Sequence, residues 1–149
     1  MGYCMRYITT SSPAPTLGEL RDALVSIDAR YRLDVTSEAP PSAGVHFDDV
    51  ALGELAIHVA GDAAFAEEVG ELLGGLKGAV GDDPASVRAV LEGASAIIAL
   101  RVIFGDRDPD ETLDTLDPIW GWFMETHEGL IQADDEGYYD DSGLILEVD

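Results

Sequence analysis

The most strongly hydrophobic segment of the chain runs from Ser95 to Gly105, and β-branched and aromatic residues dominate it. This composition favours a strand over a helix. Side chains alternate between the two faces of a strand. One face would therefore carry Ile98, Leu100, Val102 and Phe104, and the other Ile97, Ala99, Arg101 and Ile103. Because both faces are mostly apolar, the pattern predicts a central strand that is covered on two sides.

Four further segments show helical spacing. The first begins at the capping box Thr16-x-x-Glu19 and carries an apolar stripe at Leu17, Leu20, Leu24 and Ile27. Helices are also expected after Asp62, from Pro84, and after Asp108-Pro109. Pro118 is expected to break or kink the last of these helices. Its core face would be Leu116, Ile119, Trp120, Phe123 and Met124.

Shorter segments with β propensity lie between these helices. They predict strands over 6–10, 31–36, 45–47, 55–59, 129–133 and 144–148, with an arm at Tyr138-Tyr139. The order predicts a single α+β domain over 1–149, with an antiparallel or mixed sheet and helices packed on one side. Phe47-Asp48-Asp49 and Tyr139-Asp140-Asp141 each precede a terminal strand. This echo suggests a tandem βαββ-type duplication, with halves 1–60 and 95–149 joined by helices within 62–94.

The composition narrows the protein's environment. A chain of 149 residues with 46% hydrophobic content can build a core, and no window reaches 18 apolar residues. The N-terminus has no basic segment followed by an apolar stretch, so no signal peptide is expected. Cys4 is the single cysteine and cannot form an internal disulfide. A cytoplasmic location without membrane association is the resulting expectation.

Charge is the most unusual property of the sequence. Thirty acidic residues against eight basic ones give a net charge of −22, and only one basic residue is a lysine. Nucleic acid is excluded as a partner because phosphate contacts need a basic patch. Three explanations of the acidity are open: a cytoplasm rich in KCl, acidic drift in a GC-rich genome, or recognition of a basic protein partner.

One acidic stretch has the alternation of a calcium loop. Asp106, Asp108 and Asp110 are the candidate metal ligands. However, Glu111 occupies the position where such a loop needs glycine, and Pro109 stiffens it. Helix capping on an acidic surface explains the same residues.

Four residues are candidates for ligand binding. Arg101 would place a charge on a core strand, where it either forms an ion pair or anchors an anionic group. Trp122 lies opposite the Trp120 stripe of its helix and is either core or the wall of a cleft. With Tyr138 or Tyr139 it would line an aromatic cleft rimmed by acids, which is suited to organic cations.

These observations favour a non-enzymatic binding protein. A protein partner is the first hypothesis, because a field of one sign steers association with basic surfaces. A small-molecule sensor for organic cations is the alternative. No phosphate loop, zinc spacing, or combination of nucleophile and base is present, so neither a cofactor nor catalysis is predicted. No motif identifies a characterised family.

Overall fold

Eight strands and four helices make up the part of the chain that the computed structural model describes, residues 3–11, 15–38, 41–76, 84–133, 136–140 and 143–147. The elements are β1 (Tyr3–Thr9), α1 (Leu17–Ile27), β2 (Tyr31–Glu38), β3 (Pro41–Phe47), β4 (Val50–Val59), α2 (Ala63–Gly75), α3 (Pro84–Glu92), β5 (Ala96–Val102), α4 (Pro109–Thr126), β6 (Gly129–Ala133), β7 (Gly137–Asp140) and β8 (Gly143–Glu147).

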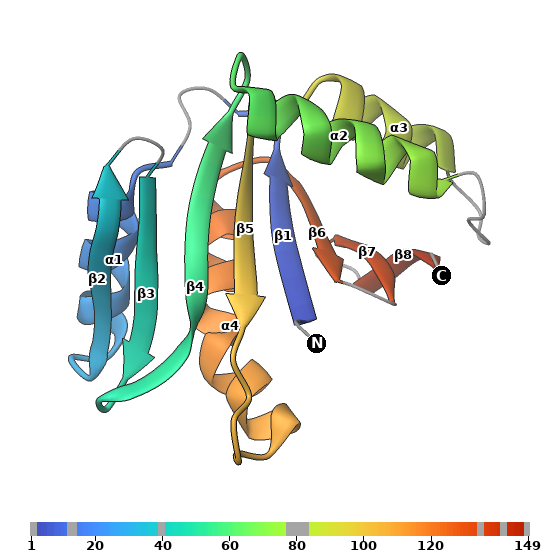
Figure 1. Ribbon diagram of the computed structural model, residues 1–149. Coiled ribbons are helices and arrows are strands. Elements are labelled where there is room, and N and C mark those ends of the chain that lie inside the picture. The colour runs from blue at the N-terminus through green and yellow to red at the C-terminus, as the bar shows by residue number, and fades with distance from the viewer. Residues whose placement is uncertain are drawn as a thin grey trace.

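The strands form one sheet in the order β2-β3-β4-β5-β1-β6-β7-β8, and neighbouring strands are antiparallel throughout (Figure 1). The expected α+β class is confirmed. The predicted core strand is β5, which lies between β4 and β1. Ile98, Leu100 and Val102, which share one face of β5, are all buried. The predicted position of this strand in the core is therefore confirmed.

Two crossover helices lie on the same face of the sheet. α1 connects β1 to the parallel strand β2 at the far edge, and α4 connects β5 to the parallel strand β6. Crossovers of this kind are right-handed. Because β1 and β5 run in opposite directions and their crossovers leave in opposite directions, both helices reach the same face, behind the sheet in Figure 1.

The other face carries α2 and α3 (Figure 1). The expectation that helices lie on one side therefore holds for α1 and α4 but not for this pair. Strand alternation explains the two layers: Tyr7 and Ile98 point into the cluster under α1 and α4, whereas Ile8 and Ile97 point into the cluster under α2 and α3. A sheet that is apolar on both faces needs a helical layer on each.

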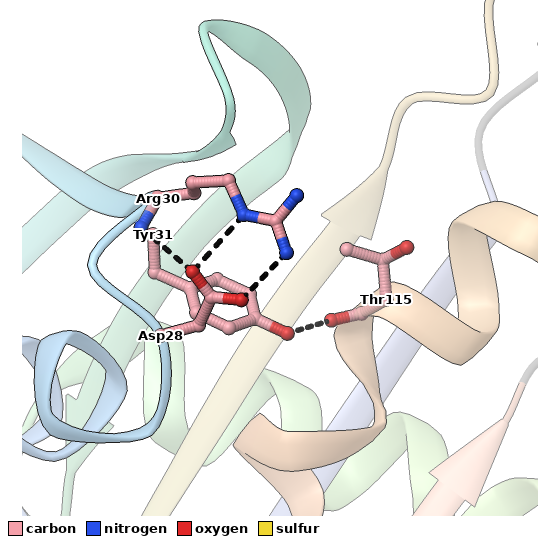
Figure 2. Close-up of polar contacts among 4 residues, drawn as sticks. All are labelled: Asp28, Arg30, Tyr31 and Thr115. Atoms are coloured by element: carbon pink, nitrogen blue, oxygen red, sulfur yellow. Dashed lines mark hydrogen bonds and ion pairs between the residues drawn. The ribbon is translucent and has the colours of Figure 1, made fainter.

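A hydrogen bond joins the far edge of the sheet to α4 (Figure 2). The hydroxyl of Tyr31 on β2 donates to the carbonyl oxygen of Thr115, at 2.7 Å. Beside it, Arg30 donates to the carboxylate of Asp28 through both its backbone and its guanidinium. These hydrogen bonds lower the pKa of Asp28 to about 2. The turn between α1 and β2 is thereby fixed against α4.

One local prediction is wrong, and for Pro118 the predicted break is wrong whereas the alternative of a kink stays a prediction. Ile27 belongs to the predicted apolar stripe of α1, but it is exposed, whereas Leu17, Leu20 and Leu24 are buried. Pro118 does not end α4, which continues from Pro109 to Thr126. Pro118 removes only the hydrogen bond to the carbonyl of Asp114. Asp114 is exposed, so solvent can satisfy that carbonyl.

The two halves share an order of elements but differ in how their strands are placed. Each runs β-α-β-β-β. After α1 the strands run inward from the edge to β4, whereas after α4 they run outward from β6 to the other edge. The duplication of 1–60 and 95–149 stays a prediction. Among the described residues, no helix is both long and apolar enough to cross a membrane.

Candidate functional site

A cavity of about 500 Å³ lies between α4 and the β6–β8 end of the sheet. One stripe of α4 forms its helical wall, and the inward positions of β1, β6 and β7 form the opposite wall. The stripe follows from helical spacing, because positions three and four apart lie on one side of a helix. The lining residues are Tyr3, Met5, Leu113, Asp117, Trp120, Met124, Ile131, Ala133, Glu136, Tyr139, Asp140 and Gly143.

Strand register brings the sheet residues of the cavity together. Met5 is paired with Ala133, and Ile131 is paired with Tyr139. Directly paired residues point to the same face of an antiparallel sheet. Tyr3 lies two positions from Met5 and therefore shares that face. The cavity walls are thus fixed by β1, β6 and β7, three neighbouring strands.

Glu136 is held at the rim of the cavity by two tyrosines. The hydroxyl of Tyr139 donates to Oε1 of Glu136 at 2.6 Å, and the hydroxyl of Tyr3 donates to Oε2. The hydrogen bond to the Glu136 carboxylate raises the pKa of Tyr139 to about 12. Tyr139 therefore remains a neutral donor near neutral pH, and the two hydroxyls orient an exposed carboxylate.

Asp117 is the acid on the helical wall. Partial desolvation, and next the negative charge of Asp114, raise its pKa above the ordinary value. Among the described residues that line the cavity none is basic, whereas Asp117, Glu136 and Asp140 are acidic. The cavity therefore has a negative potential that would favour a bound cation.

Trp120 provides an aromatic wall with an unused donor. Its side chain is 4% exposed, and its indole Nε1 is buried without a hydrogen-bond partner among the described residues. Buried polar groups are normally hydrogen-bonded. Tyr3 of β1 and Tyr139 of β7 also line the cavity, and both are partly buried. Three aromatic side chains from three elements therefore surround it.

The structure places the predicted aromatic residues in three separate environments. Tyr139 lines the cavity, as the cleft hypothesis expects. Tyr138 is 2% exposed and points to the opposite face, into the cluster under α2 and α3. Trp122 packs against Phe123 and His127, with ring centroids 5.2 and 5.8 Å away, and does not line the cavity.

Arg101 lies on the face of the sheet that α1 and α4 leave uncovered. It is exposed and donates to Oε2 of Glu54 at 2.9 Å. Both side chains line a smaller hollow of about 240 Å³. The ion pair is the simpler of the two explanations given for Arg101, because Glu54 already supplies the opposite charge.

Asp106, Asp108 and Asp110 are all exposed at the start of α4. The carboxylate of Asp108 accepts a hydrogen bond from the backbone of Asp110 at 3.1 Å and caps the helix. Within the described residues, no group of three or more His, Cys, Asp or Glu side chains is arranged to hold a metal ion. The geometry of these aspartates is that of a helix start.

Sequence reasoning missed most of the cavity. It correctly assigned Trp120 and Met124 to the core face of the helix but did not predict that they also border a cavity. It did not assign Tyr3 or Met5 to a strand. Two signals were present. Leu113, Asp117, Trp120 and Met124 form a second helical stripe beside the buried one. Neighbouring tyrosines at 138 and 139 must also point to opposite faces of a strand.

Neither a protein-family model, nor a curated protein, nor a solved structure matches the chain. The function of the protein is therefore inferred from the geometry of the site.

Proposed function

We propose that this protein binds a small organic cation in the cavity between α4 and β6–β8. The observation that carries the proposal is a cavity of about 500 Å³ whose lining combines three aromatic side chains with three carboxylates. Ligand pockets typically enclose roughly 300–1,000 Å³ and are mostly apolar with a few placed polar groups.

The chemistry of the lining favours a cation over a neutral ligand. Aromatic faces attract quaternary ammonium groups, by about 0.5–2 kcal/mol for each well-placed ring. The raised pKa of Asp117 means that partial burial and the charge of Asp114 disfavour its negative charge. A bound cation would relieve that cost.

Isothermal titration calorimetry with matched probes tests this proposal. Choline and benzyltrimethylammonium are the cations, and 3,3-dimethylbutan-1-ol is the uncharged isostere of choline. We expect the cations to bind at least about tenfold more tightly than the isostere, because a difference of 1.4 kcal/mol is tenfold. Titrations in about 0.15 M KCl screen weak binding to the acidic surface. Equal affinity for choline and its isostere would refute the proposal.

Variants locate the site. Glu136→Gln removes the charge at the rim and is expected to weaken cation binding about tenfold. Glu54→Gln is the matched control, because Glu54 is exposed on the other face of the sheet beside Arg101. Trp120→Phe is expected to abolish the change in tryptophan fluorescence on binding, whereas Trp122→Phe is expected to retain it. Thermal melts of each variant exclude unfolding as the cause.

Binding of a basic protein, the first hypothesis from the sequence, depends on the net charge of −22. The cavity favours a small ligand instead. The protein-partner hypothesis stays a prediction.

A further inference from the structure

The edge strand β2 has a pattern of charge that is complementary to itself. β2 ends the sheet, and within the described residues no strand lies beyond it. It is eight residues long, whereas β8 at the opposite edge has five. Proteins usually protect a long exposed edge, because its unpaired backbone groups can pair with another strand.

The backbone groups that face outward from β2 can be identified. The backbone N–H of Asp48 donates to the carbonyl of Arg30. In the antiparallel ladder with β3, hydrogen-bonded pairs alternate with non-hydrogen-bonded pairs. Residues 30, 32 and 34 therefore bond inward to β3, given the register in which Arg32 is opposite His46. The backbone N–H and carbonyl of Leu33, and those of Val35, point outward from the sheet.

The side chains around Leu33 alternate in charge. Arg32 and Asp34 are both exposed, lie on one face of the strand, and contact each other at 3.1 Å. We propose that two copies of this chain associate through β2 in an antiparallel pairing about Leu33. In that register Leu33 forms a hydrogen-bonded pair with the Leu33 of the second copy. Each Arg32 then lies opposite the Asp34 of the other copy, where side chains approach closely.

The two adjacent symmetric registers are less favourable. Pairing about Arg32 would place two arginines together, and pairing about Asp34 would place two aspartates together. Like charges directly opposite one another destabilise a strand pair. At the β8 edge, Glu147 is the only charged residue of the strand, so pairing there offers no opposite charges.

The surroundings of β2 also favour this partner. Residues 17–38 hold three of the eight basic residues of the chain but only five of its thirty acidic ones, so repulsion between two copies is reduced here. Among the described residues, six large apolar side chains are exposed, and three of them belong to α1 and β2: Val25, Ile27 and Val35. A two-fold pairing of β2 places the two α1 helices on the same face of a continuous sheet.

Sedimentation equilibrium of the full chain tests the proposal, from micromolar to near-millimolar concentration in about 0.15 M and about 1 M KCl. We expect a dimer, tighter at the higher salt concentration because screening reduces repulsion between two acidic copies. Arg32→Asp and Asp34→Arg are each expected to weaken the dimer about tenfold or more, since each places like charges opposite one another at two symmetric positions. The double variant Arg32→Asp/Asp34→Arg is expected to restore it.

Arg101→Asp is the matched control, because Arg101 forms an exposed ion pair on a central strand, away from the edge. It is expected to leave the dimer unchanged. Circular dichroism establishes that each variant is folded. A monomer under all conditions would overturn the proposal, and so would a dimer that both single reversals leave intact. Restoration by the double variant supports the proposed register, since a merely destabilised monomer would not recover.

Discussion

On either side of α4, the same face of the sheet is covered in different ways. Toward β2, α1 and α4 lie side by side over the strands (Figure 1), and buried residues such as Leu20, Leu24, Leu33 and Val45 fill the space between them and the sheet. The hydrogen bond from the Tyr31 hydroxyl to the Thr115 carbonyl links β2 to α4 on this side. Toward β8, α4 is the helix that borders the sheet on this face, and a cavity of about 500 Å³ is left beside it.

The strand order explains this difference. The α1 crossover passes over three strands to reach the edge, so its helix covers β2 and β3. The α4 crossover passes over one strand only, so its helix stays near the centre. β7 and β8 are then added outward without a crossover helix. The packed side is a structural core, and the open side contains the cavity in which we propose that a ligand binds.

Truncation of a leucine on each side should give the largest contrast. Leu20→Ala, in the packed side, is expected to lower the free energy of unfolding by about 2–5 kcal/mol, because it creates a new cavity. Leu113→Ala, in the cavity wall, is expected to cost about 1 kcal/mol, because the existing cavity simply grows. Urea unfolding measures both. Equal losses would show that the cavity side is as tightly packed as the other.

Two tyrosines, one buried under α4 and one at the rim of the cavity, give a second contrast by pH. Tyr7, buried against Phe123, has its pKa raised to about 12 by burial first and then by the charge of Glu128. Tyr139 has a similar pKa because of its hydrogen bond to Glu136. A phenol whose pKa is raised above its unfolded value of about 10 stabilises the fold below pH 10, and this contribution is lost as the pH rises toward 12.

Urea unfolding at about pH 9 and about pH 11.5 should therefore show a loss of stability at the higher pH, to which Tyr7 contributes about 2 kcal/mol. Tyr7→Phe is expected to reduce that loss. Glu136→Gln is expected to lower the pKa of Tyr139 toward 10 and to leave that of Tyr7 unchanged, as followed by ultraviolet absorbance of the phenolate. If both pKa values fell together, the two environments would not be independent.

Replacing an alanine by leucine on each side tests the same difference in packing by adding volume instead of removing it. Ala43 is 1% exposed in the packed side, and Ala43→Leu is expected to cost about 1–3 kcal/mol by overpacking. Ala133 lines the cavity, so Ala133→Leu is expected to cost less than about 1 kcal/mol. It is also expected to abolish binding of benzyltrimethylammonium. Thermal melts and calorimetry measure the two effects, and retained binding would place the cation elsewhere.

The sequence predicted local structure well where the cause is local. The capping box at Thr16 is present, with the backbone N–H of Glu19 donating to the Thr16 hydroxyl at 3.1 Å. Asp108 caps α4 as its position before Pro109 indicates. The central strand β5 follows from its composition. These features depend on neighbours within a few residues, so a single sequence contains the information.

The cavity could not be predicted, because it depends on the order of strands. Helical spacing places Trp120 on the core face and Trp122 opposite it, and only the position of β6–β8 decides which one borders a cavity. Tyr3 and Met5 acquire a strand conformation through pairing with Val102 and Leu100 of β5, nearly a hundred residues away. The cleft hypothesis grouped Tyr139, which lines the cavity, with Tyr138 and Trp122, which lie elsewhere in the fold.

The smallest expected change in stability concerns the turn between β3 and β4, compared with the glycines at the start of β7 and of β8. On the packed side, Asp48 and Asp49 connect β3 to β4 with φ angles of 53° and 64°. Toward the cavity, positive φ angles near β7 and β8 fall on Gly137 and Gly143. Glycine adopts positive φ without steric cost, and two-residue hairpin turns of this type favour Asp-Gly. Asp49→Gly is therefore expected to raise the free energy of unfolding by about 0.5–1 kcal/mol.

Gly137→Ala is the opposite change, at the start of β7. Gly137 has a φ of 143°, and an added Cβ would lie 1.9 Å from the carbonyl oxygen of Leu146 on β8. Urea unfolding of both variants is expected to show a gain for Asp49→Gly and a loss for Gly137→Ala. Asp49→Gly also removes an exposed ion pair with Arg32, which contributes little. A loss of stability in Asp49→Gly would mean that this ion pair outweighs the relief of backbone strain.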